Sequence, residues 1–236
     1  MDGLQPEQQL QKADAKKKVA LVIGAGDATG GEIAKRFARG GYIACMTRRN
    51  AEKLQPLIAE IEAEGGLAYG FASDARKENQ VIALVEEIEA NIGEIDVLVF
   101  NIGANVPCSI LEETARKYFK IWEMACFGAF LTGREVAKRM VVREHGSIIF
   151  TGATAGIRGA ANFAAFAGAK HALRALAQSM ARELGPKNIH VAHVVVDGAI
   201  DTDFIKDTFP DMYARKEQDG ILNPVHIAEN YWHLSQ

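Results

Sequence analysis

The stretch KVALVIGAGDATGGEIAKRFARGG, residues 18–41, joins a short apolar run to a glycine-rich turn and an amphipathic segment. The apolar run is typical of a buried strand, and the amphipathic segment predicts a helix that ends at Gly40 and Gly41. Glycine permits a tight turn and lets backbone amides approach a pyrophosphate at the positive end of a helix. This order of elements predicts a dinucleotide-binding turn, and a glycine-rich turn with a purely structural role is the alternative.

The pattern continues along the chain, where short apolar runs alternate with longer amphipathic stretches. Alternation of this kind predicts an α/β fold, a Rossmann-type doubly wound parallel sheet between two helical layers. Right-handed crossovers then place the loops at the carboxyl ends of the strands along one crevice, where such sheets bind ligands. The six predicted strands are KVALVIG, YIACMT, LAYGFAS, VLVFNI, SIIFTG and HVAHVVV.

The organisation is that of one domain. Residues 1–17 are a polar lead-in that we expect to be mobile, and residues 18–236 form a single dinucleotide-binding domain. After the sixth strand we expect a short helix around Thr208 to Lys216 and another that begins at Pro224.

Composition excludes several classes of function. The net charge of −3 and pI of about 6.1 give no basic surface for nucleic acid. No apolar run reaches the roughly 18 residues needed to cross a membrane, and the stretch MDGLQPEQQLQKADAKKK lacks the apolar core expected of a secretory signal. Cys45, Cys108 and Cys126 are too few and too widely spaced for a disulfide framework or a metal site. They predict reduced thiols in a cytoplasmic protein without a metal.

Arg48 and Arg49 follow the second predicted strand, where a carboxylate would bind the ribose diol of NAD. A guanidinium there suits a 2′-phosphate, so the sequence favours NADP over NAD. The negative charge of Asp27 in the glycine turn disfavours a phosphate nearby. The alternative to a cofactor role is that Arg48 and Arg49 are solvent-exposed residues at the start of the next helix.

From about Lys18 to Thr202 these residues resemble the short-chain dehydrogenase/reductase family. Gly24 and Gly30 match the outer glycines of its Gly-x3-Gly-x-Gly turn, with Ala28 in the middle place. VFNIGA is similar to its Asn-Asn-Ala-Gly segment, and Asp74 resembles its adenine-contacting aspartate. Three further stretches follow in the family's order, namely GSIIFTGATAGIRG, FAAFAGAK and VVVDGAIDT. The resemblance implies cofactor contacts at Gly24, Gly26, Asp27, Thr29, Gly30, Arg48, Arg49, Asp74, Ala75, Asn101, Gly103, Lys170, Gly198, Ile200 and Thr202.

The family's catalytic tetrad is only partly present. Its Tyr-x3-Lys pair is represented by Phe166 and Lys170, while Ala153 stands at the serine position and Ala125 at the asparagine position. In the family the tyrosine hydroxyl exchanges a proton with the substrate, and the lysine lowers its pKa and holds the nicotinamide ribose. A phenyl ring has no ionisable proton, so general acid–base catalysis, typically about 10² to 10⁴ in rate, is lost unless another group supplies it.

Other groups near the tetrad positions offer weak replacements. Lys170 has a movable pKa, but its ammonium is expected to be occupied by ribose hydroxyls. Thr151 and Thr154 are expected to bond backbone groups and so close the strand or turn. His171 projects about 100° away around the helix, and Cys126 is expected to be inert core.

Lys170 itself needs a partner in a helix of small residues, because burying an unpaired ammonium is costly. The cofactor ribose supplies one, and a lysine that reaches solvent along the crevice edge is the alternative.

Two main hypotheses of function remain. One is an NAD(P)-dependent oxidoreductase for a small alcohol or carbonyl compound, with a site rebuilt around Lys170. The other is a catalytically silent NADP-binding protein, a sensor or assembly partner. A purely structural interaction module would require the glycine turn and Arg48 to be incidental.

The resemblance also implies a homodimer or homotetramer through the fourth and fifth helices. It assigns 203–222 to covering a substrate that the sequence does not identify. The sequence ends at YWHLSQ without the family's usual seventh strand, so either the molecule ends early or the sequence is incomplete. The sixth strand is then expected to be an edge, and a surface used for association is lost.

Overall fold

The six apolar runs form a six-stranded parallel sheet in the computed structural model, which describes residues 18–236. The predicted lead-in of residues 1–17 lies outside the described residues. The strand order β3-β2-β1-β4-β5-β6 reverses at β1, which is where ligands bind in doubly wound sheets. The strands are β1 (Lys18–Ile23), β2 (Ile43–Arg48), β3 (Leu67–Ala72), β4 (Glu94–Phe100), β5 (Gly146–Ala153) and β6 (Ile189–Val196).

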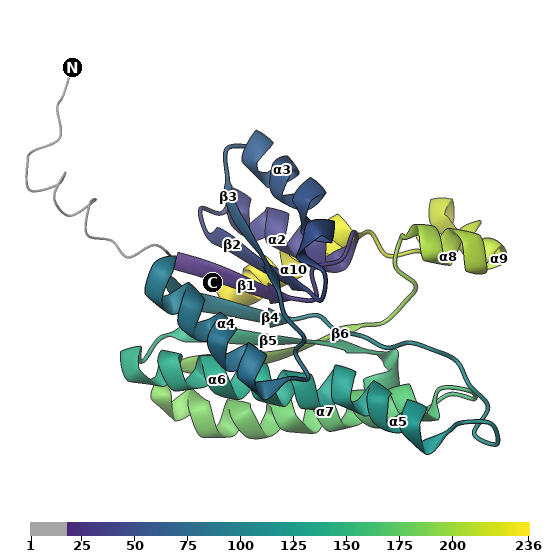
Figure 1. The fold of residues 1–236 in the computed structure, drawn as a ribbon. Coiled ribbons are helices and arrows are strands. Elements are labelled where there is room, and N and C mark those ends of the chain that lie inside the picture. Colours follow the sequence, from purple (N-terminus) through teal and green to yellow (C-terminus); the bar gives the residue numbers. More distant parts are fainter. Residues whose placement is uncertain (1–17) are drawn as a thin grey trace, which may run out of the picture.

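Helices cover both faces of this sheet (Figure 1). The longer helices are α2 (Thr29–Arg39), α3 (Gln55–Ala63), α4 (Glu78–Asn91), α5 (Ala115–Trp122), α6 (Gly128–Arg143), α7 (Ala164–Leu184) and α10 (Pro224–Ser235). Single turns complete the chain at α8 (Asp203–Thr208), α9 (Pro210–Tyr213), Ala51–Leu54, Thr154–Gly156, Gly185–Lys187 and Lys216–Gln218. The predicted Rossmann-type three-layer fold is therefore confirmed.

Side chains of each strand alternate between two apolar cores, as the period of two in a strand requires. In β1, Leu21 and Ile23 pack in the core under α4, α6 and α7, while Ala20 and Val22 pack in the core under α2 and α10. All four are essentially without exposure. The continuous apolar runs of the sequence follow from burial on both faces.

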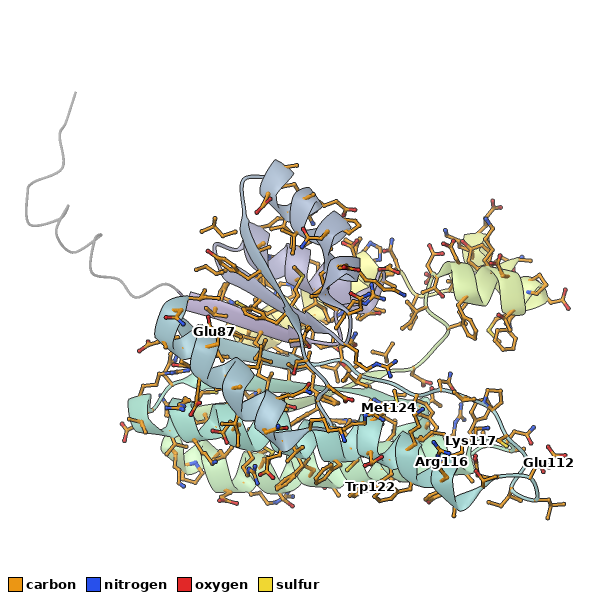
Figure 2. The ribbon with its side chains drawn as sticks, in the orientation of Figure 1. Glu87, Glu112, Arg116, Lys117, Trp122 and Met124 are labelled. Carbon is orange, nitrogen blue, oxygen red and sulfur yellow. The ribbon has the colours of Figure 1, made fainter. Side chains whose placement is uncertain are left out.

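A π-helical segment at Glu123–Phe127 joins α5 to α6 into one long helix. Such segments occur mostly as single wide turns and often mark functional sites. Figure 2 shows Met124 on the side that faces the sheet and Trp122 on the outer side of α5. The segment thus directs one side chain toward the strand ends, and the sequence analysis did not predict it.

The region after β6 is less regular. α8 and α9 pack on each other and stand apart from both helical layers (Figure 1). The helix predicted around Thr208 to Lys216 is present only as α9, and α8 was not predicted. The helix that begins at Pro224 is confirmed, and the Asn223 side chain caps it by accepting from the Val225 N–H. Among residues 18–236, no helix combines the length and apolar character needed to span a bilayer.

Candidate functional site

One continuous groove runs along the carboxyl ends of the strands. It consists of a cavity of about 890 Å³ over β1, β4 and β5 and a smaller one of about 330 Å³ beside β2 and β3. The two share Gly24, Gly26, Asn101, Ile102 and Gly103 as lining residues, so they adjoin at the glycine turn and the end of β4. This groove lies at the switch point of the sheet, where the sequence predicted ligand binding.

The glycine turn forms the floor where the two cavities meet. Gly24 has a φ of +85°, a conformation that favours glycine. Gly30 lies in the first turn of α2, and a Cβ at this position would stand 2.5 Å from the Gly24 carbonyl oxygen. Close approach of α2 to β1 therefore requires glycine at position 30, and it brings the N-terminus of α2 to the groove.

The structure brings most of the predicted cofactor residues to this groove. The larger cavity is lined by Gly24, Gly26, Asp27, Thr29, Gly30, Asn101, Gly103, Lys170, Gly198 and Ile200, and the smaller one adds Arg48, Arg49, Asp74 and Ala75. Thr202 lines neither, because its side chain caps α8 by accepting from the Ile205 N–H. The assignment of these residues to a cofactor stays a prediction.

Arginine side chains surround the smaller cavity. Arg48 Nη1 lies 3.0 Å from Asp27 Oδ1, so the carboxylate in the glycine turn is already paired. Arg76 makes two bonds to the Asp74 carboxylate, 2.6 Å and 2.9 Å long, and these lower the Asp74 pKa. Arg49 also lines this cavity; it makes no hydrogen bond or salt bridge within residues 18–236, and its positive charge helps to lower the Asp74 pKa.

Three of the four tetrad positions line the larger cavity. Phe166 and Ala153 line it, and Lys170 Nζ lies 5.8 Å from the centre of the Phe166 ring. Ala125 is fully buried in the small apolar cluster behind Phe166 and does not line the cavity. Geometry thus places three of the four positions around one space, in which Lys170 carries the sole ionisable group of the three.

Lys170 is 2% exposed, so the alternative of a lysine that reaches solvent is wrong. Its Nζ donates to the Thr151 carbonyl at 2.7 Å and to the Ile102 carbonyl at 3.3 Å. Burial lowers its pKa to about 8. Two carbonyls from β5 and the end of β4 therefore stabilise the ammonium in place, and it faces the groove.

The prediction that Thr151 and Thr154 bond backbone groups is wrong. Thr151 Oγ1 lies 2.8 Å from the hydroxyl of Tyr231 on α10, and Thr154 Oγ1 donates to the Asp197 carboxylate. Both threonines lie at the carboxyl end of β5, where α10 and the end of β6 supply side-chain partners that are distant in sequence.

Two further groups near Lys170, the Cys126 thiol and the His193 ring, are uncharged near neutral pH. Cys126 is buried, and burial raises the pKa of its thiol, as expected for an inert core cysteine. His193 on β6 faces Gly152, and burial together with Lys170 and Arg174 lowers its pKa to about 4, so its ring is neutral near pH 7. His171 is exposed, as its position on the helix predicted. Among residues 18–236, no group of His, Cys, Asp and Glu side chains is arranged to hold a metal ion.

Several lining residues were not predicted from the sequence. Asn105, Arg158 and Phe163 line the outer end of the larger cavity, and Ser73, Arg76 and Met124 line the smaller one. All but Met124 lie in loops that follow strands, and that position is the signal that could have identified them. Met124 lies in the π-helical segment between α5 and α6. No residue of 203–222 lines either cavity, so its role as a substrate cover stays a prediction.

The buried Lys170 predicts a specific pH dependence of stability. Its folded pKa of about 8 lies below the ordinary 10.5, so between these values the unfolded chain binds a proton that the folded chain lacks. The free energy of unfolding should therefore rise by about 3 kcal/mol from pH 8 to pH 10.5 through this residue. Buried Cys45 and Cys126, whose thiol pKa values are raised, act in the opposite direction in both proteins, so the test is the difference between them. In urea unfolding, the wild type should gain about 3 kcal/mol relative to Lys170→Met between pH 8 and pH 10.5.

The control for this measurement is Lys187→Met, because Lys187 is exposed. Its unfolding curves should follow the wild type at each pH. Equal pH slopes in the wild type and Lys170→Met would contradict the assignment of this proton to Lys170.

Comparisons with known proteins agree on one family. The family model described as short chain dehydrogenase matches residues 18–212. The 2-dehydro-3-deoxy-D-gluconate 5-dehydrogenase of Formosa agariphila is 32% identical over 211 residues, which cover 84% of this chain and 80% of that protein. A solved short-chain dehydrogenase from Rhodopseudomonas palustris is 47% identical with a TM-score of 0.80, covering 93% of this chain and 92% of its own.

A third similar protein is a variant of actinorhodin polyketide ketoreductase, solved with NADPH. It is 26% identical with a TM-score of 0.85, covering 93% of this chain and 90% of its own. The matched residues span the sheet, the glycine turn and the Lys170 helix described above. The chain belongs to the short-chain dehydrogenase/reductase family, whose members are oxidoreductases that bind NAD(P).

Proposed function

We propose that this chain is an NAD(P)-dependent oxidoreductase that acts on a small alcohol or carbonyl compound. One observation carries the proposal: one cavity is lined both by the glycine turn and by Lys170, together with the tetrad positions Phe166 and Ala153. The names of the similar proteins, a dehydrogenase and a ketoreductase, support this substrate class. The proposed setting is the cytoplasm, which the unpaired Cys45, Cys108 and Cys126 support.

The groove fits a dinucleotide by its own chemistry. Thr29 is 7% exposed at the N-terminus of α2, and its hydroxyl has no hydrogen-bond partner within residues 18–236. A pyrophosphate at this helix end would give that buried hydroxyl an acceptor. Lys170 would hold the nicotinamide ribose, and Asn101 already ties the end of β4 to the turn through Gly24 O at 3.3 Å. A nicotinamide dinucleotide would supply the hydride donor or acceptor of the reaction.

The residues that line the larger cavity have separate roles in substrate binding and proton transfer. Phe163 and Phe166 line it with apolar rings that exclude water around a substrate. Lys170 Nζ is the atom that can hold or release a proton there, since its pKa of about 8 lies near neutrality. Ala153 offers no hydrogen bond to a substrate oxygen, so this site is a degenerate form of its family's tetrad.

The second candidate function is a catalytically silent NADP-binding protein. Three replacements favour it, because Phe166, Ala153 and Ala125 leave Lys170 as the one tetrad position with a polar side chain. Such a protein would serve as a sensor or an assembly partner.

Nucleotide titration combined with turnover separates the two candidates. NADPH, NADP⁺ and NADH are titrated by calorimetry, and turnover is measured at high protein concentration with diketones, aldehydes, β-ketoesters and alcohols. Turnover that disappears in Lys170→Met, with the protein still folded, supports the oxidoreductase. Nucleotide binding without any turnover supports the silent protein, and no nucleotide binding overturns both.

The proposed preference for NADP over NAD rests on Arg49. Its guanidinium lines the smaller cavity and makes no hydrogen bond or salt bridge within residues 18–236, whereas Arg48 is bonded to Asp27 and to the Lys53 carbonyl. Arg49→Gln should weaken NADPH binding by about tenfold or more and leave NADH affinity nearly unchanged, because only NADPH carries a 2′-phosphate.

The measurement is calorimetric titration of both nucleotides. Arg182→Gln on α7 is the matched control, because Arg182 lines neither cavity. Equal losses for NADPH and NADH in Arg49→Gln would show that Arg49 does not read the 2′-phosphate.

A homodimer or homotetramer through α5, α6 and α7 is also part of the proposal. Four aromatic rings, Phe119, Trp122, Phe127 and Phe130, stack in series along α5 and α6. Phe119 is 56% exposed and Phe130 is 37% exposed, so the series is partly open to a second copy. Phe119→Glu with Phe130→Glu should yield a monomer in light scattering, while Val142→Glu at the end of α6 should not change the mass.

A further inference from the structure

Arg158 occupies the outer end of the larger cavity, in the loop between β5 and α7. Its backbone N–H donates to the Thr154 carbonyl at 3.1 Å, which closes a turn and fixes the base of the side chain. The guanidinium itself has no hydrogen bond and no ion pair within residues 18–236. Five N–H donors at a cavity mouth are thus left without a protein acceptor.

The charges that line this cavity are unbalanced. Asp27, Arg158 and Lys170 are the charged lining residues, and Asp27 is paired with Arg48. Lys170 is held by neutral carbonyls, so neither cation has a carboxylate against it. Asp197, the acidic group that receives the Thr154 hydroxyl bond, is not a lining residue of this cavity. The outer cavity therefore presents a positive field to a bound molecule.

The walls between these two cations are mainly apolar. Phe163, Phe166 and Ala160 are among the apolar lining residues of the cavity that Arg158 and Lys170 also line. Phe166 and Ala153 cannot orient a substrate oxygen by hydrogen bonds, so orientation has to come from another polar group. A guanidinium at one end of an apolar space orients a carboxylate by two parallel hydrogen bonds.

We propose that Arg158 binds the carboxylate of an acidic substrate, a hydroxy or oxo acid whose apolar body lies against Phe163 and Phe166. This inference rests on the proposed function, since it names the substrate class of the same groove. The acid end lies at the cavity mouth, and the carbon that reacts lies toward Lys170.

Calorimetric titration with hexanoate and hexanamide tests this proposal, because the two probes share an apolar chain and differ in charge. The titrations use the full chain saturated with NADPH, so that the phosphate-binding part of the groove is filled. Hexanoate should bind about tenfold or more tightly than hexanamide to the wild type. Arg158→Gln should make the two affinities equal, and Arg158→Lys should keep part of the preference because it retains charge without the fork.

Arg182→Gln is the matched control and should keep the wild-type preference, because Arg182 lines neither cavity. Equal affinity of the wild type for both probes overturns the proposal, as does a preference that survives in Arg158→Gln or an absence of binding by either probe. NADPH binding with any of these results leaves the proposed function standing. If the protein binds no nucleotide, the titrations are made without NADPH. A preference for hexanoate that depends on Arg158 would then overturn the proposed function but keep Arg158 as an anion-binding residue.

Discussion

Phe166→Tyr combined with Ala153→Ser should raise carbonyl reductase turnover by about 10²- to 10⁴-fold, the usual worth of general acid–base catalysis. Both positions line the larger cavity, so the new hydroxyls reach the same space. Lys170 Nζ lies 5.8 Å from the Phe166 ring centre, and its positive charge lowers the pKa of a phenol placed there. Turnover of NADPH with a β-ketoester or an aldehyde measures the gain.

Phe163→Tyr is the control for this experiment. Phe163 lines the same cavity, but it precedes α7 and has no ring contact with Lys170. The same chemical change at position 163 should therefore leave turnover near its wild-type value. Ala125→Asn is not part of the design, because Ala125 is fully buried in a packed cluster and an amide there would be buried as well.

The separate contributions distinguish two explanations of a gain. Phe166→Tyr alone should account for most of it, because the tyrosine supplies the proton, while Ala153→Ser alone should add little without it. Unchanged turnover in the double variant, with NADPH bound as in the wild type, would mean that the groove does not position a substrate against Phe166. The oxidoreductase proposal would then lose its geometric basis.

The sheet and its helices could be predicted because the central strands β1, β2, β4 and β5 are buried on both faces and are therefore continuous apolar runs. The glycine turn was equally readable, since the close contact of Gly30 with the Gly24 carbonyl excludes other residues. These features depend on local sequence or on a single close approach, and so they leave a local pattern.

The environment of Lys170 could not be predicted in the same way. Its two carbonyl partners come from Thr151 and Ile102, on segments that are distant in the chain, and backbone carbonyls carry no residue-type signal. The partners of Thr151 and Thr154 are likewise Tyr231 and Asp197, so local rules for threonine gave the wrong acceptors. Such contacts follow from the tertiary fold.

Irregular helical segments were also missed. The π-helical turn at Glu123–Phe127 adds one residue to a turn inside an otherwise continuous helical pattern, and periodicity does not resolve that change. α8 contains the exposed Phe204 among polar residues and packs on neither core, so its sequence has no amphipathic pattern that would predict a helix. Sequence periodicity arises from burial, so it does not predict helices that bury little surface.

Gly30→Ala should weaken NADPH binding by roughly 10- to 100-fold and destabilise the fold by about 1–3 kcal/mol. The added methyl would stand 2.5 Å from Gly24 O, 2.9 Å from the Ala25 Cα and 2.9 Å from Asn101 Nδ2. Two of these atoms are backbone, so the turn or the start of α2 must move. Calorimetric titration and urea unfolding measure the two effects.

Gly26→Ala separates the two effects, because a Cβ at position 26 meets no protein atom within 4 Å. Gly26 lines both cavities, so its methyl would project into the groove and should weaken NADPH binding without a loss of stability. Gly185→Ala, also free of contacts and remote from the groove, should leave both quantities unchanged. If Gly30→Ala and Gly26→Ala both bound NADPH as the wild type does, the glycine turn would be structural only, because a pyrophosphate on its amides has no room for either methyl.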